Sequence, residues 1–172
     1  MSGALWVLRH LLAIGVLPFT VTVIIPLWLA RRNGTVLALG TTPGQIAVQM
    51  AGAILLVIGL ILFVASLQRF ATEGRGTLAP WDPPRSLVIR GPYRYVRNPM
   101  ISGVVFVLFG EGLLLLSRPH LGWALTFLAI NAVYIPLLEE PQLEHRFGDA
   151  YRDYCRHVPR LFPRLRPWLG PA

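Results

Sequence analysis

The chain of 172 residues has little charge, a single cysteine and no lysine. Only 14% of its residues are charged, against about 25% in an ordinary soluble domain, and 54% are hydrophobic. Water is therefore not its main solvent. The lone Cys155 excludes an intramolecular disulfide and a cysteine-rich metal site, and the four scattered histidines share no helical ligand spacing. We expect no metal site.

Long apolar stretches dominate the sequence, whereas strand patterns and a GxGxxG nucleotide loop are missing. A bilayer core needs about 20 mostly apolar residues per helical crossing. Four stretches meet this requirement: Leu11–Ala30, Ile46–Leu67, Pro99–Ser117 and Leu121–Leu138. The sequence therefore predicts an all-α integral membrane protein of one domain with four transmembrane helices. We expect residues 1–69 to be scaffold and residues 70–172 to bind any cofactor and to carry the catalytic groups.

The first stretch has the basic flank of a secretory signal, because Arg9 and His10 precede it. It runs longer than the apolar region of a signal, however, and two arginines follow it in place of a small-residue cleavage site. We therefore expect a retained membrane anchor. The second stretch carries Gly52 and Gly59, which would let a neighbouring helix come close.

All sixteen basic residues are arginine, and their distribution predicts the topology. Six lie between the second and third crossings, six lie in the tail and Arg9 is on the same side, which leaves Arg31, Arg32 and Arg118 on the other. The positive-inside rule then places both termini and the long middle loop on the cytoplasmic side of the plasma membrane. The net charge of +8 indicates contact with anionic lipid headgroups and not with nucleic acid.

The sequence after the fourth crossing has the pattern of an amphipathic helix. Apolar or aromatic residues recur at helical spacing, at Leu143, Phe147, Tyr151, Tyr154 and Val158. Charged residues fill the positions between them. We expect one helix, or two short helices broken at Gly148, lying at the cytoplasmic interface.

Three acidic residues are candidates for chemistry. Glu111 is the only acid well inside a predicted crossing, and a carboxylate in that position is by default functional. A structural hydrogen bond or a pair with an interfacial arginine is the alternative. Glu139 and Glu140 adjoin where the last crossing meets the cytoplasm, so a cation or several donors should hold them. Salt bridges to the arginine-rich loop would suffice without a ligand.

Two arginines stand at the entry to the third crossing, which should begin at Pro99 after the N-cap candidate Asn98. Arg94 and Arg97 are three residues apart and could share one helical face. The planar guanidinium group suits two-point contact with a carboxylate or a phosphate. Anchoring at the positive side of the membrane is the simpler alternative.

Two blocks of sequence resemble the isoprenylcysteine carboxyl methyltransferase family and the related phospholipid N-methyltransferases. They are GPYRYVRNPMISG (Gly91–Gly103) and EEPQLEHRFGDAYRDYCRHVPRLFP (Glu139–Pro163), and their combination is more specific than either alone. The first two crossings carry no family information. The resemblance implies a membrane enzyme that uses S-adenosyl-L-methionine, with the cofactor enclosed at the cytoplasmic interface.

The resemblance also implies roles for individual residues. Gly110 and Gly112 match a cofactor-binding GxG motif of the family. Glu139 and Glu140 match its later glutamate pair. Arg97, followed by asparagine and proline, matches its Arg-Asn-Pro signature.

The chemistry of S-adenosylmethionine fits these residue types. Glutamates suit its ammonium group and ribose hydroxyls, and an arginine suits its carboxylate. The aromatic faces of Tyr93, Tyr151 and Tyr154 would favour its sulfonium by cation–π attraction. Methyl transfer is a direct displacement, so the enzyme mainly aligns donor and acceptor.

The acceptor should be lipophilic, and its reacting group decides which residues act. A carboxylate needs no base but an orienting arginine, for which Arg97 is the first candidate and Arg94 the second. An amine needs a carboxylate to take its proton, and Glu111 or Glu140 could do so. The residues leave both possibilities open.

Two other functions compete with methyl transfer. The tail motif YCRHVPRLFP is also similar to the end of membrane sterol reductases, which use a nicotinamide cofactor but are considerably longer. A non-enzymatic membrane module, whose arginines hold lipid headgroups, is the second. Cofactor binding in detergent would separate the three hypotheses.

Overall fold

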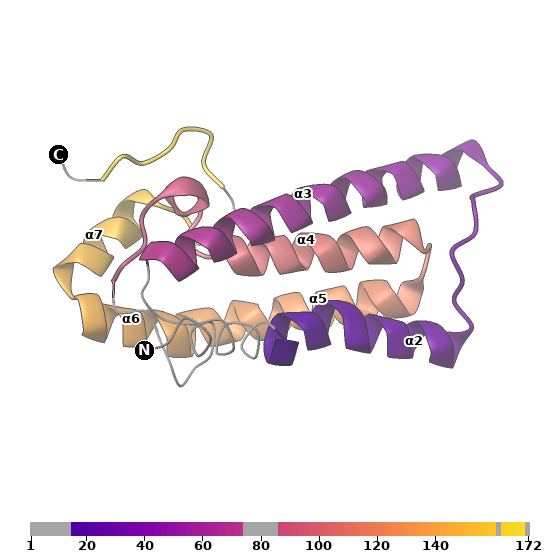
Figure 1. Ribbon diagram of the computed structural model, residues 1–172, viewed down its shortest axis with the longest axis horizontal. Helices are drawn as coiled ribbons and strands as arrows, with labels where there is room; N and C mark the ends of the chain where they lie inside the picture. Colours follow the sequence, from indigo (N-terminus) through magenta and orange to yellow (C-terminus); the bar gives the residue numbers. More distant parts are fainter. Residues whose placement is uncertain (1–14, 74–85, 161–162, 171–172) are drawn as a thin grey trace.

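The computed structural model describes residues 15–73, 86–160 and 163–170. Helix accounts for 76% of these residues and none of them lies in a strand, which confirms the all-α prediction. Helices α3 (Pro43–Glu73), α4 (Pro99–Leu114) and α5 (Arg118–Tyr134) are antiparallel in turn, and α2 (Ile25–Asn33) lies beside α5 (Figure 1). The shorter elements gather at one end of this bundle: η2 (Gly91–Arg94), α6 (Glu140–Phe147) and α7 (Asp149–His157).

Helices α3 and α4 pack closely because glycines face each other at two levels. A Cβ atom on Gly59 would come within 2.7 Å of the Gly103 carbonyl oxygen. One on Gly110 would come within 2.8 Å of the Gly52 carbonyl oxygen. Larger side chains would push the two backbones apart. The predicted role of Gly52 and Gly59 in close helix approach is confirmed.

Two helices in the described part of the chain are long and apolar enough to cross a membrane, not four. They are Pro43–Phe70 and the continuous helix Arg118–Phe147, which contain the second and fourth predicted stretches. Helix α4 has 16 residues, just below the usual range for a crossing of about 17–25. In each long helix only 17% of the most apolar window is buried inside the protein, so most of its apolar side chains face outward.

The first predicted stretch is described only from residue 15 onward. There it forms a π-helical segment, η1 (Gly15–Ile24), that leads into α2. Two side chains of α5 bind its backbone: Nε2 of the buried His120 lies 3.1 Å from the Pro26 carbonyl oxygen, and Trp123 donates to the Val21 carbonyl oxygen at 3.1 Å. His120 is therefore a histidine with satisfied hydrogen bonds in the core.

The fourth predicted crossing does not end at Glu139-Glu140-Pro141, because the helix continues to Phe147. A π-helical turn, η3 (Ile135–Glu139), lies between α5 and α6. The Glu140 N–H donates to the Ile135 carbonyl oxygen five residues back. This wider turn lets the chain pass Pro136 and Pro141, which have no N–H for the ordinary helical bond. Glu140 and Glu144 consequently lie one turn apart on one helix face.

The amphipathic segment folds as two short helices, and this alternative of the prediction is confirmed. Helices α6 and α7 meet at Gly148, whose φ of +55° favours glycine. A buried cluster forms along α7 and the residue that follows it, from Tyr151, Tyr154 and Val158. Helix α4 begins at Pro99 as predicted, although the side chain of Asn98 makes no capping hydrogen bond.

Candidate functional site

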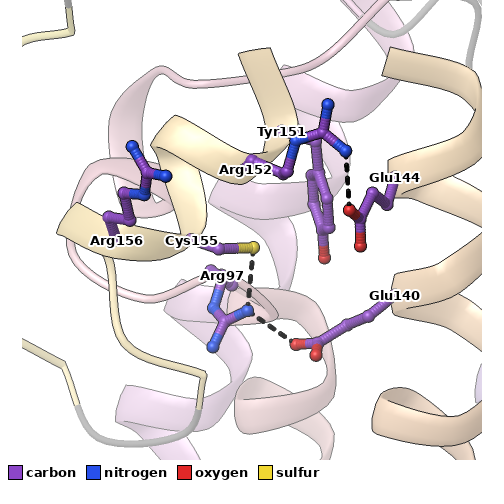
Figure 2. Close-up of a pocket in the computed structure, with 7 residues that line it drawn as sticks. All are labelled: Arg97, Glu140, Glu144, Tyr151, Arg152, Cys155 and Arg156. Carbon is purple, nitrogen blue, oxygen red and sulfur yellow. Dashed lines mark hydrogen bonds and ion pairs between the residues drawn. The ribbon is translucent and has the colours of Figure 1, made fainter. Parts of the chain in front are cut away.

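The turn that joins η2 to α4 places Arg97 at the end of the bundle. Gly91 begins the turn with a φ of +58°, and Tyr93 and Val96 are buried beneath it. The Arg97 N–H donates to the Pro159 carbonyl oxygen at 2.9 Å, which ties the turn to the chain after α7. The Arg97 side chain then points toward Glu140 and Cys155 (Figure 2).

Glu140 lies between two arginines. Its Oε1 accepts hydrogen bonds from Arg97 Nη1 and Arg160 Nε, both at 2.8 Å, and its Oε2 accepts one from Arg160 Nη2 at 2.5 Å. The Glu140 and Arg97 side chains are only 15% and 13% exposed. Such a pair is much less screened than a surface ion pair. The hydrogen bonds to Glu140 also raise the pKa of Arg160. The three side chains form what we call the Glu140 cluster.

The Glu140 cluster borders a polar cavity of about 280 Å³ between α6 and α7 (Figure 2). Acidic, basic, aromatic and thiol side chains all line it: Arg97, Glu140, Glu144, Tyr151, Arg152, Cys155 and Arg156. We call this space the polar cavity. It could hold a small ligand that carries charges of both signs and a flat or cationic group.

Two arginine nitrogen atoms, one at the polar cavity and one in η2, have no hydrogen-bond partner in the part of the chain that the structure describes. Nε of Arg97 is buried and donates no hydrogen bond there, and the same is true of Nε of Arg94. Arg97 Nη1 also donates to Cys155 Sγ at 2.9 Å. Unpaired donors of a guanidinium group are costly to bury and suit an anionic ligand.

The three predicted tyrosines have different positions. Only Tyr151 lines the polar cavity. Tyr154 is buried and its hydroxyl donates to the Tyr93 carbonyl oxygen at 2.7 Å, which fastens α7 to the η2 turn. Burial raises the pKa of Tyr93, of Tyr151 and of Tyr154, so all three phenols stay neutral near pH 7. Tyr93 and Tyr154 hold α7 against the η2 turn and do not line the polar cavity.

The rim of the polar cavity carries an exposed ion-pair network. Arg152 bonds Asp149 at 2.6 Å and Glu144 at 3.0 Å. The hydrogen bond from Arg152 lowers the pKa of Asp149. About half of each side chain in the Arg152–Glu144 pair is exposed, so the pair contributes little stability and can open at low cost.

The structure brings together only some of the predicted site residues. Arg97, Glu140 and Tyr151 line the polar cavity. Glu139 is half-buried in η3, does not line the cavity, and its side chain makes no hydrogen bond to a described residue. Arg94 ends η2, and its carbonyl oxygen accepts the Trp168 N–H at 3.0 Å.

Gly110, Glu111 and Gly112 lie in the last turns of α4, at the other end of the bundle (Figure 1). A rise of about 1.5 Å per residue places Glu111 about 20 Å from Arg97. Gly110 packs against the α3 backbone, and Gly112 packs against Leu121 of α5. One carboxylate oxygen of Glu111 is buried without a hydrogen-bond partner among the described residues. The structure does not bring this motif to the polar cavity.

The sequence analysis missed five residues of the site, which are Glu144, Arg152, Cys155, Arg156 and Arg160. Helical spacing could have found three of them. Glu144 and Cys155 follow Glu140 and Tyr151 by four residues and therefore share their helix faces. Arg156 follows Arg152 by the same spacing.

A family model described as phospholipid methyltransferase matches residues 48–150, which is more than half of the chain. The chain belongs to the phospholipid methyltransferase family. No curated protein sequence and no solved structure matches it. The family resemblance stated from the two sequence blocks is thus confirmed. The part of the chain that matches the phospholipid methyltransferase model begins inside α3. The second predicted crossing therefore does carry family information, contrary to our expectation.

Proposed function

We propose that this protein transfers a methyl group from S-adenosylmethionine to a lipophilic acceptor at the cytoplasmic surface of the plasma membrane. The observation that carries the proposal is the Glu140 cluster, which is partly buried and borders the polar cavity. It occurs in a chain that belongs to a methyltransferase family. Neither a nicotinamide reductase nor a plain lipid-binding module accounts for that family match.

The residues around the polar cavity fit the polar groups of S-adenosylmethionine. Arg156 lines the cavity and its side chain makes no hydrogen bond to another described residue, so its guanidinium is available for the cofactor carboxylate. Glu144 is 48% exposed, and its one ion-pair partner among the described residues is the similarly exposed Arg152, so it can turn to an ammonium group or a ribose hydroxyl. The ring of Tyr151 suits the sulfonium.

Glu140 contributes charge as well as position. It is the least exposed acid that lines the polar cavity, and an ammonium group nearby would be attracted by it with little screening. Both of its oxygens are bonded to arginines, so we propose that it also fixes the orientation of Arg97. Arg97 Nη2, which makes no hydrogen bond to a described residue, would then hold an anionic group of the acceptor.

Bound S-adenosylmethionine supplies an electrophilic methyl group, which a nucleophile takes by direct displacement. The protein has to hold the nucleophile in line with that group. If the acceptor reacts through a carboxylate, Arg97 orients the carboxylate and no base is needed. If it reacts through the amine of a phospholipid, Arg97 binds the adjacent phosphate, and Glu140 or Glu144 accepts the proton. Glu111 lies too far along α4 for this task.

We propose four membrane crossings with the polar cavity on the cytoplasmic side. The long helices α3 and α5–α6 would span the bilayer, and η1–α2 and α4 would be shorter crossings packed against them. The exposed apolar surface of α3 supports contact with lipid. The end of the bundle that carries the polar cavity is rich in arginine, as the positive-inside rule requires.

Cysteine labelling tests this orientation. In a Cys155→Ser background, we would place single cysteines at Asp153 in α7 and at Leu39, which is 90% exposed and lies beyond the opposite end of the bundle. A membrane-impermeant maleimide added to intact cells should label the Leu39→Cys protein and spare the Asp153→Cys protein. Labelling in the reverse pattern would contradict the proposed topology.

Methyl transfer from radiolabelled S-adenosylmethionine tests the activity itself. The purified protein in detergent should transfer label into the organic phase of a total lipid extract or into a small prenylated thioether acid. Reduced nicotinamide cofactor should neither bind nor be consumed. A protein that binds no S-adenosylhomocysteine and labels no lipophilic acceptor would refute the proposed function.

A further inference from the structure

An apolar groove lies at the junction of α3 and α4, close to the polar cavity but separate from it. Helix α3 contributes Ile58, Ile61, Leu62 and Ala65. Helix α4, the η2 turn and Pro163 of the C-terminal segment complete its lining. The volume of the apolar groove is about 450 Å³, against about 280 Å³ for the polar cavity.

The lining of the apolar groove suits hydrocarbon. No charged side chain contributes to it. The hydroxyl of Ser102, one of its few polar groups, donates to the Asn98 carbonyl oxygen at 3.1 Å and so needs no further partner. Ile61 is 64% exposed, so the groove opens to the surroundings of the bundle. The α3 residues of the groove lie in a candidate membrane span, so a chain that enters the groove leaves lipid and not water. Its preference for the groove then comes from packing against the lining and not from the hydrophobic effect.

The groove also has a charged end. Ile58, Leu62 and Ala65 share one face of α3, and Arg69 continues that face one turn further. The stem of Arg69 lies against Gly91, where a Cβ atom would come within 3.3 Å of its Cγ. Arg69 is half exposed and pairs with Glu73 through Nη1 at 3.0 Å. A chain in the groove would have its polar end beside the remaining donors of this guanidinium group, at the level of the η2 turn.

A single stretch of chain separates the groove from the polar cavity. Val96 lines the apolar groove and Arg97, the next residue, lines the polar cavity. Their Cα atoms are neighbours at about 3.8 Å. Pro163 closes the groove from the other side, and its neighbour Arg164 donates its N–H to the Tyr95 carbonyl oxygen at 3.0 Å. The groove and the polar cavity are therefore one residue apart along the chain at this turn.

We propose that the apolar groove binds the hydrocarbon chain of the methyl acceptor while the anionic head of that molecule passes the turn at Tyr95–Arg97 to reach Arg97. The inference rests on the proposed methyltransferase function and adds where the chain of the acceptor lies. It predicts that chain length governs acceptor binding and leaves cofactor binding unchanged. Chains too short to fill the groove should have a higher KM than chains that fill it, because they make fewer packing contacts with the lining.

Filling the groove tests the proposal. Ala65→Phe should raise KM at least tenfold for the longest prenyl thioether acid or lysophosphatidylethanolamine that the wild-type protein methylates. It should leave KM for the shortest member of the same series and the Kd of S-adenosylhomocysteine within twofold. The matched control is Val64→Phe, because Val64 is 48% exposed and does not line the groove. Equal KM changes for long and short acceptors in Ala65→Phe would overturn the proposal, as would no change for either.

Photo-crosslinking gives a second measurement that requires no turnover. Diazirine-bearing versions of the same two probes, bound in phosphatidylcholine nanodiscs, should label peptides from 58–65 or 95–106. The unlabelled acceptor should compete, and phosphatidylcholine should not. Labelling elsewhere, or equal competition by phosphatidylcholine, would overturn the groove assignment even if S-adenosylhomocysteine binds. Failure of S-adenosylhomocysteine to bind would instead count against the proposed function, so the two failures are distinguishable.

Discussion

A glutamate lies at each end of α4, Glu140 beside its start and Glu111 near its end, but the surroundings of the two differ. At its start, Arg97 is paired with Glu140 and faces the polar cavity. At its other end, one oxygen of Glu111 is buried without a described partner, and Gly110 contacts the α3 backbone. The glycines beside Glu111 therefore pack the helices, and this end of α4 does not contribute to the polar cavity. We therefore expect the paired charges beside the polar cavity, and not the unusual acid in a crossing, to mark the site.

The largest effect should come from Glu140→Gln. It removes the least exposed acid of the polar cavity and leaves Arg97 and Arg160 without a counter-charge. We expect affinity for S-adenosylhomocysteine to fall at least a hundredfold and the free energy of unfolding to fall by about 1–3 kcal/mol. Isothermal titration and thermal unfolding in detergent measure the two effects. Asp153→Asn is the matched control, because Asp153 pairs with His157 on the surface and does not line the cavity. Equal affinity in both variants would return Glu140 to a purely structural ion pair.

Arg97→Lys should have the next largest effect. Lysine keeps the charge but loses the planar group that contacts Glu140 and Cys155 together. We expect kcat to fall at least tenfold, with a change of threefold or less in the Kd of S-adenosylhomocysteine, because Arg97 is assigned to the acceptor. Arg90→Lys, an exposed arginine just before the same turn, should change neither. Normal turnover in Arg97→Lys would remove Arg97 from the mechanism.

Gly110→Ala tests the other end of α4. The added Cβ would lie 2.7 Å from the backbone nitrogen of Leu56, so α3 and α4 must separate slightly. We expect the free energy of unfolding to fall by about 1–3 kcal/mol and the Kd of S-adenosylhomocysteine to stay within twofold. Gly122→Ala is the control, since nothing lies within 4 Å of its Cβ position. A large loss of affinity in Gly110→Ala would place the cofactor at the GxG motif after all.

Glu111→Gln should have the smallest effect. The amide removes a charge from a carboxylate whose buried oxygen has no described partner. We expect stability to change by less than about 1 kcal/mol or to rise slightly, with turnover unaffected. Thermal unfolding and the methyl-transfer assay can be run on the same preparation. A loss of turnover would restore Glu111 as a catalytic acid or base.

The sequence predicted the fold best where a pattern is long and local. The apolar runs located α3 and α5, and the aromatic period after Pro141 located α6 and α7 with their break at Gly148. The predicted end of the fourth crossing at Pro141 was wrong, because a proline after two acids favours a helix end, whereas the helix continues to Phe147. Instead, a π-helical turn before Pro141 lets the helix continue although proline has no N–H to donate. Whether such a turn forms depends on the whole helix and not on the residues next to the proline.

The candidate site was predicted only in part for a related reason. Arg97 and Glu140 stand in recognisable blocks, so motif and chemistry identified them. Cys155 and Arg156 reach the polar cavity only because α7 folds back beside α6. Tyr154 was expected at the cofactor, but its hydroxyl fastens α7 to the η2 turn. Spacing along the chain gives the helix face on which such residues lie, but the tertiary contacts that bring that face to the cavity are not encoded in it.

The central claim is tested most directly by titrating S-adenosylhomocysteine into variants that alter one or the other end of α4. Wild-type protein, Glu140→Gln and Gly110→Ala would be compared by isothermal titration in the same detergent. If the polar cavity is the cofactor site, the wild type and Gly110→Ala should bind S-adenosylhomocysteine, and Glu140→Gln should not. Binding that survives in Glu140→Gln and disappears in Gly110→Ala would contradict the account.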